Sequence, residues 1–510
     1  MPEVVSLGLD GAAWHELDRL MAAGELPNFA RLVEEGARAP LRSVSPPVTC
    51  PAWRCSTAGK NPGNVGVFWW LTLDREMGEF TTPDAAAFDT ADVWDYLCDE
   101  GYRCAIVNLP MTYPPRKIDG LMVSGFGAPI DGIETGAESI TYPDELHERL
   151  IDRYGWQVGV EDVTDVDGPE RAYDLIKSRF DFLSDLLDEG FDYLQLTIFY
   201  INVLQHKYGN GPKTVEAWRL IDNRLGELLD EDTLLIIYSD HGHSTVERTF
   251  SVNEWLRRKG YLSIKDEAAD TVLASVYEGL KRAGVSPRRV ADFAETTLPT
   301  RVYKSLMSSG YPVSTAELTE RFDWTDSTAV AVSQGPVYLN REVLGADYHR
   351  VRERLRRELK AVTYEDDPVL SDIRLAEDVY DGKYVRDGPD LVLEPAEGWE
   401  LYGGLTPDVV ETEVTSWTSG NHPVGVLAMN GPGVADVELS ERSILDIAPA
   451  ILQYMGCALP SDMGGEVIDA AFETDLGPRE TCQPLETTST SVGEDERDLE
   501  SHLSDLGYLE

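Results

Sequence analysis

The stretch TLLIIYSDHG, residues 233–242, is an apolar run that ends in polar side chains followed by a glycine. A continuous apolar run of this length is typical of a strand that is buried on both faces of a sheet. Similar runs are VVSLGLD (4–10), CAIVNLP (104–110), YLQLTIF (193–199) and VGVLAMNGPG (424–433). Apolar residues at helical spacing occupy 15–35, 92–101, 169–189 and 212–230. This alternation predicts an α/β fold with a mostly parallel central sheet and helices on both faces.

The chain of 510 residues is long enough for a large domain that carries an insertion. Residues 1–243 and 396–473 are expected to form the two parts of an α/β core. The less regular stretch 244–395 interrupts them, with helical segments at 267–285 and 346–361 and turn-rich pieces such as DDPVLSD (366–372). We expect it to be an inserted cap that selects the substrate. Residues 474–510 read as an acidic, Ser/Thr-rich tail, with a possible short helix at its end.

The chain is strongly acidic, with 91 Asp and Glu against 44 Lys and Arg and a net charge of -47. Such an excess repels nucleic acids and anionic membranes, so neither is an expected partner. Abundant acid with few lysines also resembles the proteins of salt-loving, halophilic microbes, in which salt screens self-repulsion. We interpret the charge as adaptation to the solvent. It predicts neither a function nor an oligomeric state.

Targeting signals are not apparent in the sequence. It holds no apolar run of 18 residues, and its first residues, MPEVVSLGLDG, enter a strand-like run at once. The six cysteines form no CxxC pair, so reduced thiols are the simplest interpretation. We therefore expect a cytoplasmic protein.

Side chains that bind metals follow several of the predicted strands. Asp10 ends the first strand, Asp240 and His241 end the quoted run, and Asn202 and His206 follow 193–199 at a spacing that places them on one helix face. His422 lies directly before the strand at 424–433. In open α/β sheets ligands gather at the carboxyl ends of the strands, and oxygen with imidazole donors suits zinc or manganese.

Each of these residues also has a structural interpretation when it is taken alone. Asp10 or Asn202 could cap a helix, and a loop histidine such as His422 is usually solvated. The pair Asp240-His241 followed by glycine at the end of an apolar strand seldom serves packing. For the other residues, a functional role rests on their combination.

The motifs together resemble the alkaline phosphatase superfamily, in particular its type I phosphodiesterase/nucleotide pyrophosphatase branch. The stretches that carry this resemblance are GLDGA (8–12), PPVTCPAW (46–53), GKNPGNVGVF (59–68), NLPMTYPP (108–115), VLQHKYG (203–209), SDHG (239–242), GPDLVLEP (388–395) and SGNHPVGVLAMNGPG (419–433). They occur in the family's order over most of the chain. The resemblance implies an alkaline phosphatase-like fold and a metal-dependent hydrolase of phosphodiesters or related small phosphoesters.

The resemblance also implies a site with two divalent cations. One ion would be held by Asp10, Asp240, His241 and the hydroxyl of Thr49, and the other by His206, His422 and the residue at position 202. Thr49 matches the nucleophile of the family, which attacks phosphorus to give a phospho-threonine that water then hydrolyses. The structural interpretation of Thr49 is the N-cap of a helix that begins at CPAW, and both roles can hold at once. His243, Trp69 and Lys60 are expected behind the ligands or beside the substrate.

The sequence departs from the family pattern at two positions. Relatives with nucleotide pyrophosphatase activity have an asparagine that contacts the phosphoryl group soon after the position of Val65-Gly66, where this chain reads VFWW (67–70). Trp69 could offer a stacking face there, or the two tryptophans could simply pack the cap against the core. At position 202 the family has aspartate, and this chain has asparagine.

Three functions remain open on these observations. The first is the hydrolase, and the second is a phosphoryl or sulfuryl transferase or a phosphomutase, which the superfamily also contains. The third is a non-catalytic metal-binding relative whose second site has decayed at Asn202. A formylglycine sulfatase is not expected, because Thr49 rather than Cys50 stands two residues before Pro51 and because Trp53 occupies the position of the required arginine.

Overall fold

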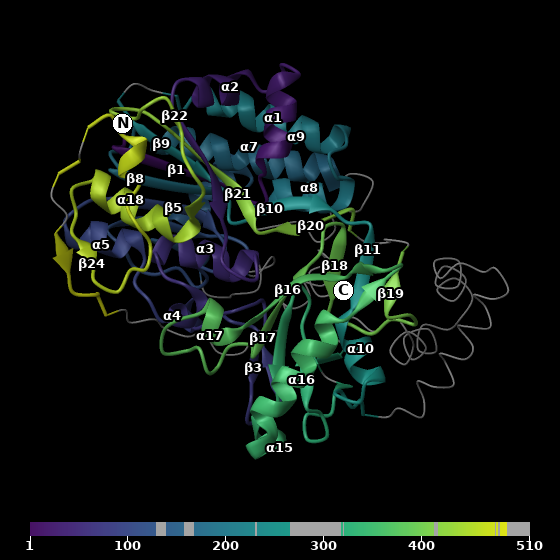
Figure 1. Cartoon of the computed structure of the whole chain (residues 1–510). Coiled ribbons are helices and arrows are strands. Elements are labelled where there is room, and N and C mark those ends of the chain that lie inside the picture. The colour runs from purple at the N-terminus through teal and green to yellow at the C-terminus, as the bar shows by residue number, and fades with distance from the viewer. Residues whose placement is uncertain are drawn as a thin grey trace.

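The computed structural model (Figure 1) describes residues 1–128, 139–157, 168–229, 232–265, 318–319, 321–412, 417–474, 476–477 and 480–486. Its largest element is a ten-stranded sheet in the order β22-β2-β21-β9-β1-β8-β5-β6-β7, with β23 pairing with β2 off that path. The strands are β1 Val4–Leu9, β2 Ala37–Arg42, β5 Cys104–Leu109, β6 Gly120–Ser124, β7 Thr141–Tyr142, β8 Tyr193–Ile198, β9 Leu234–Tyr238, β21 Val424–Asn430, β22 Val437–Glu438 and β23 Arg442–Ser443.

The middle of this sheet is parallel, as the continuous apolar runs predict. Strands β9, β1, β8, β5 and β6 pair in parallel, and every residue of β1, β5, β8 and β9 is buried. The edges are mixed, because β21 runs antiparallel to both β9 and β2, and β7 runs antiparallel to β6. The α/β fold with a helix-flanked sheet is therefore confirmed, with antiparallel strands added outside its parallel centre.

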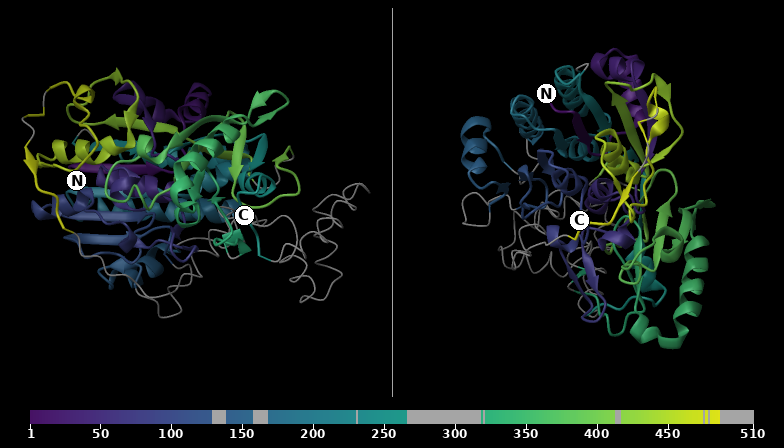
Figure 2. Two further views of the ribbon diagram at one scale, coloured as in Figure 1. Left: turned by 60° about the horizontal axis from the view of Figure 1, so that its bottom comes forward. Right: turned by 90° about the vertical axis from the view of Figure 1, so that its left-hand side faces the viewer.

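Helices pack on both sides of this sheet (Figures 1 and 2). One group is α1 Trp14–Ala22, α2 Pro27–Glu34, α7 Gly168–Leu186, α8 Tyr200–Tyr208 and α9 Pro212–Leu225, and the other is α3 Thr49–Ala58, α5 Val93–Asp99 and α18 Ile447–Tyr454. The helix expected over 15–35 is divided into α1 and α2. Gly24 adopts a φ of +74° after α1, and Pro27 is the first residue of α2, so the chain turns between them.

A second lobe lies beside the central sheet (Figure 1). It holds the sheet β18-β11-β19 and the sheet β12-β13-β17-β16, together with helices α10, α15, α16 and α17. The bounds are β11 Arg248–Ser251, β12 Ala329–Ala331, β13 Pro336–Leu339, β16 Leu370–Leu375, β17 Leu391–Pro395, β18 Trp399–Tyr402, β19 Val410–Glu411, α10 Val252–Arg258, α15 Arg341–Leu344, α16 Tyr348–Lys360 and α17 Ala376–Val379. One continuous hydrophobic core joins this lobe to the central sheet.

Two connections tie the second lobe to the rest of the molecule. Strand β10 (Gly242–Thr245) follows β9 and pairs antiparallel with β20 (Ser419–His422), which leads into β21. The hairpin β3–β4 (Thr72–Asp74 and Glu79–Thr81) also packs there, since the ring of Phe80 lies 5.8 Å from that of Phe322. The lobe thus includes residues that lie outside 244–395 in the sequence.

The structure also tests local predictions in this region. The helix expected at 346–361 is α16. The piece DDPVLSD, expected to be turn-rich, contains one tight turn at Glu365–Asp366, both at positive φ, between the short strands β14 (Thr363–Tyr364) and β15 (Asp367–Pro368), and it then enters β16. The helix expected at 267–285 and the short C-terminal helix lie outside the described residues. No helix in the described ranges is long and apolar enough to cross a membrane.

Helix α3 is anchored by a buried ion pair. Arg54 is 2% exposed and donates to the fully buried carboxylate of Asp92 at 2.8 Å, and Thr57 and Arg116 donate to the same carboxylate at 2.7 and 2.6 Å. Arg54 also donates to the carbonyl of Met111 at 2.8 Å. These bonds fix the orientation of α3, and Thr49 is its first residue.

The Asp92 carboxylate provides a test of this anchor. Because Asp92→Ala leaves the buried guanidinium of Arg54 without its counter-charge, we expect a loss of about 3–5 kcal/mol in the free energy of unfolding, measured by denaturant titration. Asp18, which pairs with Arg38 at the surface, is the control, and Asp18→Ala should cost about 0–1 kcal/mol. Equal losses in the two variants would contradict the proposed anchor.

Candidate active site

The carboxyl ends of two neighbouring strands bring Asp10 and Asp240 together. Strands β1 and β9 are parallel, with Gly8 opposite Tyr238, and each aspartate lies two residues further along its own chain. Both side chains are 0% exposed. The register of the parallel sheet therefore places two carboxylates side by side in the interior.

Each carboxylate has one oxygen engaged by the protein and the other directed into the same gap. Trp53 Nε1 donates to Asp10 Oδ2 at 3.0 Å, and the backbone N–H of Gly11 donates to Asp240 Oδ1 at 3.1 Å. The remaining oxygens, Asp10 Oδ1 and Asp240 Oδ2, are buried without a hydrogen-bond donor among the described residues. This is the arrangement expected of metal ligands whose second oxygen is held in place by the protein.

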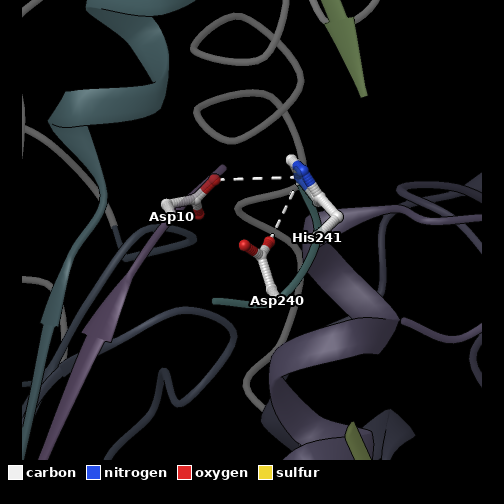
Figure 3. Close-up of side chains that lie close together, drawn as sticks. All are labelled: Asp10, Asp240 and His241. Carbon is white, nitrogen blue, oxygen red and sulfur yellow. Dashed lines mark ion pairs between the residues drawn. The ribbon is translucent and has the colours of Figure 1, made fainter. Parts of the chain in front are cut away.

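His241 and Thr49 complete this group. His241 Nε2 lies 3.2 Å from Asp240 Oδ2 and 3.8 Å from Asp10 Oδ1 (Figure 3), and 3.0 Å from the hydroxyl oxygen of Thr49. His241 Nδ1 lies 2.8 Å from the carbonyl oxygen of Gly242, which requires a proton on Nδ1. In the neutral ring Nε2 then carries the lone pair and accepts the Thr49 hydroxyl.

The electrostatics of this cluster favour a cation. Burial, and then repulsion from Asp240, raise the pKa of Asp10 well above its usual value, and burial also raises the pKa of Asp240. Two carboxylate oxygens and an imidazole lone pair face one another without a positive charge between them. Asp10, Asp240 and His241 offer ligand atoms that all lie within 4.8 Å of one another, so these residues fit a divalent cation.

Helix α8 brings Asn202 and His206 to the same region. Both are buried, and Asn202 lies beside Asp10, where its amide partly offsets the rise that burial causes in the pKa of Asp10. The approach is close, because a β-carbon on Gly11 would lie 2.4 Å from Asn202 Oδ1, and Gly11 has a φ of +68°. Only glycine allows the chain to turn there and still admit the amide. Asn202 is thus neither a surface amide nor the N-cap of α8, which is Phe199.

His206 has the tautomer that a metal ligand requires. Its Nδ1 donates to the carbonyl of Ser419 at 2.6 Å, so the lone pair of the neutral ring is on Nε2. Burial, with smaller contributions from nearby His241 and His243, lowers the pKa of His206 to about 3, so the ring is neutral at pH 7. The ring also stacks on Trp417 at 3.8 Å.

His422 and His243 lie on the β10–β20 ribbon. His422 is exposed, and its Nδ1 lies 3.1 Å from the backbone nitrogen of Val424. His243 is buried, with Nδ1 2.9 Å from the carbonyl oxygen of Gly11 and 3.0 Å from Gln205 Nε2. His422 therefore lies on the outer side of the site, whereas His243 supports the turn that follows Asp10.

Asp10 and Thr49 could instead have been helix caps, and the observed helix boundaries test this alternative. Helix α1 begins at Trp14 with Ala13 as its N-cap, so Asp10 does not cap it. Helix α3 begins at Thr49 itself and its N-cap is Val48, so the N-cap interpretation of Thr49 is not what the structure has. The Thr49 hydroxyl instead contacts His241.

Trp69 and Lys60 lie further from the cluster. Trp69 is fully buried and donates through Nε1 to Gln334 of the second lobe at 3.0 Å, so it packs this lobe against the core. Lys60 is buried and forms an ion pair with Asp462 at 2.6 Å. Each side chain thus has a structural partner, and a role in substrate binding stays a prediction.

A cavity of about 750 Å³ opens next to the cluster. Pro46 and Pro47, just before Thr49, line it together with His243 and His422. Asp10, Thr49, Asp240 and His241 are fully buried and do not line the cavity, which lies outside this group of residues. The second lobe contributes Gln334, residues 393–397 and residues 399–401 to the lining.

Sequence reasoning missed several residues of this region. Trp53 and Gln205 lie inside motifs that carry the family resemblance. However, no spacing in the sequence marks a tryptophan that donates a hydrogen bond to a carboxylate, or a glutamine that contacts a histidine. Glu16, 0% exposed and 2.8 Å from Gln205 Nε2, lies on an ordinary amphipathic helix. Glu400 lines the cavity, and it belongs to none of the sequence motifs described above.

Comparisons with known proteins agree with this geometry. The model of the family "Type I phosphodiesterase / nucleotide pyrophosphatase" matches residues 4–424. A search of curated proteins returned no match. Solved structures with the same fold include murine ectonucleotide pyrophosphatase/phosphodiesterase 5, at a TM-score of 0.52 and 12% identity over 91% of this chain and 97% of that one.

Two further structures are similar over comparable lengths. Phosphonoacetate hydrolase from Sinorhizobium meliloti 1021 has a TM-score of 0.54 and 17% identity over 86% of this chain and 91% of its own. A mutant of the alkaline phosphatase PafA has a TM-score of 0.53 and 13% identity over 92% and 99%. At these identities the structural likeness shows the fold.

The family model places the chain among the phosphoester hydrolases of the alkaline phosphatase superfamily, whose members depend on metals, and the fold and the carboxylate–histidine cluster agree with that class. Within that superfamily, the chain belongs to the type I phosphodiesterase/nucleotide pyrophosphatase family. The predicted family and enzyme class are therefore confirmed.

The paired carboxylates lead to a prediction for the metal-free protein. Since the pKa of Asp10 is raised in the fold, its ionisation destabilises the folded state at neutral pH, and metal-free protein should gain stability as the pH falls toward the raised pKa. At pH 7 without metal, Asp10→Asn should unfold with a free energy about 1–4 kcal/mol higher than that of the wild type.

With metal bound, the order of stabilities should reverse, so that the wild type is more stable than Asp10→Asn. The wild type should gain about 2.7 kcal/mol when the cation is present at one hundred times its dissociation constant, and Asp10→Asn should gain little. Thermal unfolding with a chelator and with added zinc or manganese measures both effects. His243→Ala is the control that should keep the metal response. A metal response in Asp10→Asn equal to that of the wild type would remove Asp10 from the ligands.

Proposed function

We propose that this protein hydrolyses phosphodiesters or related phosphoesters with Thr49 as its nucleophile. The observation that carries this proposal is the position of Thr49, fully buried at the start of α3 with its hydroxyl oxygen 3.0 Å from His241 Nε2 beside two aspartates. A threonine in such a place has no packing function that requires its hydroxyl.

The residues of the chain support this chemistry in three ways. When no cation is bound, His241 Nε2 accepts a hydrogen bond from the Thr49 hydroxyl and so orients its oxygen beside the two aspartates. With a cation bound, that lone pair would serve the cation instead. The N-terminus of α3 places its partial positive charge and its first N–H groups beside the nucleophile, where a phosphoryl oxygen gains charge. The Arg54–Asp92 pair keeps that helix end fixed. A divalent cation held by Asp10, Asp240 and His241 would lower the pKa of the Thr49 hydroxyl and offset phosphoryl charge.

In the proposed reaction, Thr49 Oγ1 forms a bond to phosphorus as the ester oxygen leaves with a proton. Water then breaks the bond between phosphorus and Oγ1 and restores the hydroxyl. The product alcohol and a phosphate or phosphomonoester are released. Cys50 takes no part in this scheme, because it is fully buried in the core and burial raises the pKa of its thiol.

A second cation, zinc or manganese like the first, is proposed at Asn202, His206 and His422. The neutral ring and Nε2 lone pair of His206 support it, as does the buried amide of Asn202 beside Asp10. Because His422 is exposed and lines the cavity, we expect this ion on the cavity side. Because the amide is uncharged, we expect this ion to bind more weakly than the first.

Relatives with known ligands support the same function. Murine ectonucleotide pyrophosphatase/phosphodiesterase 5 has been solved as an inactive threonine-to-alanine variant in complex with AMP, and the Sinorhizobium hydrolase in complex with phosphonoacetate. A threonine is therefore required for activity in one relative, and both relatives bind small phosphorus-containing acids or esters.

The nucleophile can be tested by Thr49→Ala. This variant should lose at least about 10³-fold in turnover of bis(p-nitrophenyl) phosphate while it keeps its fold and its first metal ion, because the side chain removed supplies the attacking oxygen and not the main ligands. Activity assays with metal analysis of the same samples measure both. Cys50→Ala is the control that should retain activity. Near-normal turnover by Thr49→Ala would refute the role of Thr49.

The second ion can be tested by Asn202→Asp. A carboxylate at this position should raise the affinity for the second ion by about tenfold or more without a change at the first, because it adds a charged oxygen to a neutral ligand set. Titration of metal-free protein with manganese, followed by calorimetry, resolves the two steps. An unchanged second step would show that position 202 is not a ligand.

A further inference from the structure

A glutamate of the second lobe projects over the ribbon that carries His422. Glu400 lies on β18, and a β-carbon built on Gly420 of β20 would lie 2.3 Å from Glu400 Oε2. The carboxylate therefore lies directly against the backbone of Gly420, in space that a side chain at this position would occupy. Both residues line the cavity.

This carboxylate has no partner among the residues that the structure describes. Among the described residues none donates a hydrogen bond to Glu400 or forms an ion pair with it, although the side chain is part-buried. Burial alone raises the pKa of Glu400 to about 8. A part-buried carboxyl group that lacks a protein partner is costly, and the cost is removed when a ligand supplies the missing donor.

The cations on the cavity wall are already engaged. Arg42 donates to both oxygens of Glu441, at 2.6 and 2.9 Å, and Arg374 donates to Glu394 at 2.9 Å. Each arginine of the described lining is thus already paired with a glutamate, so the wall offers a second phosphate group little uncompensated positive charge. A nucleotide pyrophosphate brings such a group, and its recognition requires a cation. The cavity favours an organic group that is neutral or positive.

The distance between Glu400 and the cluster suits a short ester. Gly420 and His422 are two residues apart on β20, so their side-chain positions lie on the same face, roughly 7 Å apart along the strand. His422 pairs with Gly242, which directly follows His241. If the phosphoryl group of a substrate lies at the cluster, a substituent two or three bonds from its ester oxygen would therefore lie near Glu400.

We propose that Glu400 binds a hydrogen-bond-donating group, an ammonium or a hydroxyl, on the organic part of the substrate. The enzyme would then select phosphoesters of amino alcohols or polyols and reject nucleotide pyrophosphates. This inference rests on the proposed function for the position of the phosphoryl group. It adds a specificity-determining residue that belongs to the second lobe.

Three nearly isosteric probes test the proposal: 2-aminoethyl phosphate, 2-hydroxyethyl phosphate and propyl phosphate. Their affinities for the manganese-loaded protein are measured by calorimetry. The wild type should bind at least one of the first two on the order of tenfold more tightly than propyl phosphate, because only they can donate to the carboxylate. Preference for the amine identifies an ammonium site, and equal preference for both identifies a hydroxyl-type donor site.

The matched variants are Glu400→Gln and Glu397→Gln, the latter at an exposed glutamate on the same wall. Glu400→Gln should reduce the preference to within about twofold with unchanged manganese content, and Glu397→Gln should leave it intact. Equal affinities for all three probes in the wild type would overturn the proposal. A preference that survives in Glu400→Gln, or a loss of manganese in that variant, would also overturn it.

Hydrolysis of bis(p-nitrophenyl) phosphate by the same samples separates this proposal from the proposed function. A protein that hydrolyses the diester but binds the three probes equally refutes the role of Glu400 alone. A protein that shows the binding preference but no hydrolysis refutes the proposed reaction and leaves the role of Glu400 standing.

Discussion

The interior of this protein holds two carboxylates, Asp10 and Asp240, in a place from which water is excluded. Burying like charges together is unfavourable unless a cation or a proton offsets them, and the raised pKa of both groups expresses that cost. The surrounding structure does not relieve it. One oxygen of each carboxylate is held by Trp53 or by the N–H of Gly11, and the other oxygen faces His241. The fold thus surrounds a site that needs a positive charge, which the protein itself does not supply there.

Buried ion pairs elsewhere hold the elements that surround this gap. Arg54 and Asp92 fix the helix that starts at Thr49. In the second lobe Asp390, fully buried, accepts hydrogen bonds from Arg75 at 3.0 Å, from Arg341 at 2.7 Å and from Tyr348 at 2.6 Å. Asp390 belongs to the motif GPDLVLEP and joins the β3–β4 hairpin to the lobe. Part of the resemblance to the family therefore reflects the support of the site and not its chemistry.

The distribution of charge differs between the surface and the cavity. The net charge of -47 belongs to the whole chain and gives no information about the substrate. In the cavity the relevant fact is which charges already have partners. The arginines of the wall are bonded to glutamates, whereas Glu400 is without one among the described residues. The specificity of the site would then depend on a single carboxylate from the second lobe, while the chemistry depends on residues of the central sheet.

The sequence by itself determined the parallel centre of the sheet, since continuous apolar runs are stable only where both faces are covered, and it determined that Asp10, Asp240 and His241 stand at strand ends. It also indicated that Asn202 and His206 share a helix face, because helical spacing is local. Only the tertiary structure decided the rest. The antiparallel direction of β21, the bond from Trp53 to Asp10 and the contact of Glu400 with Gly420 join residues far apart in the chain. Local patterns encode which face of an element is buried, but the partner it meets there is chosen by the packing of the whole chain.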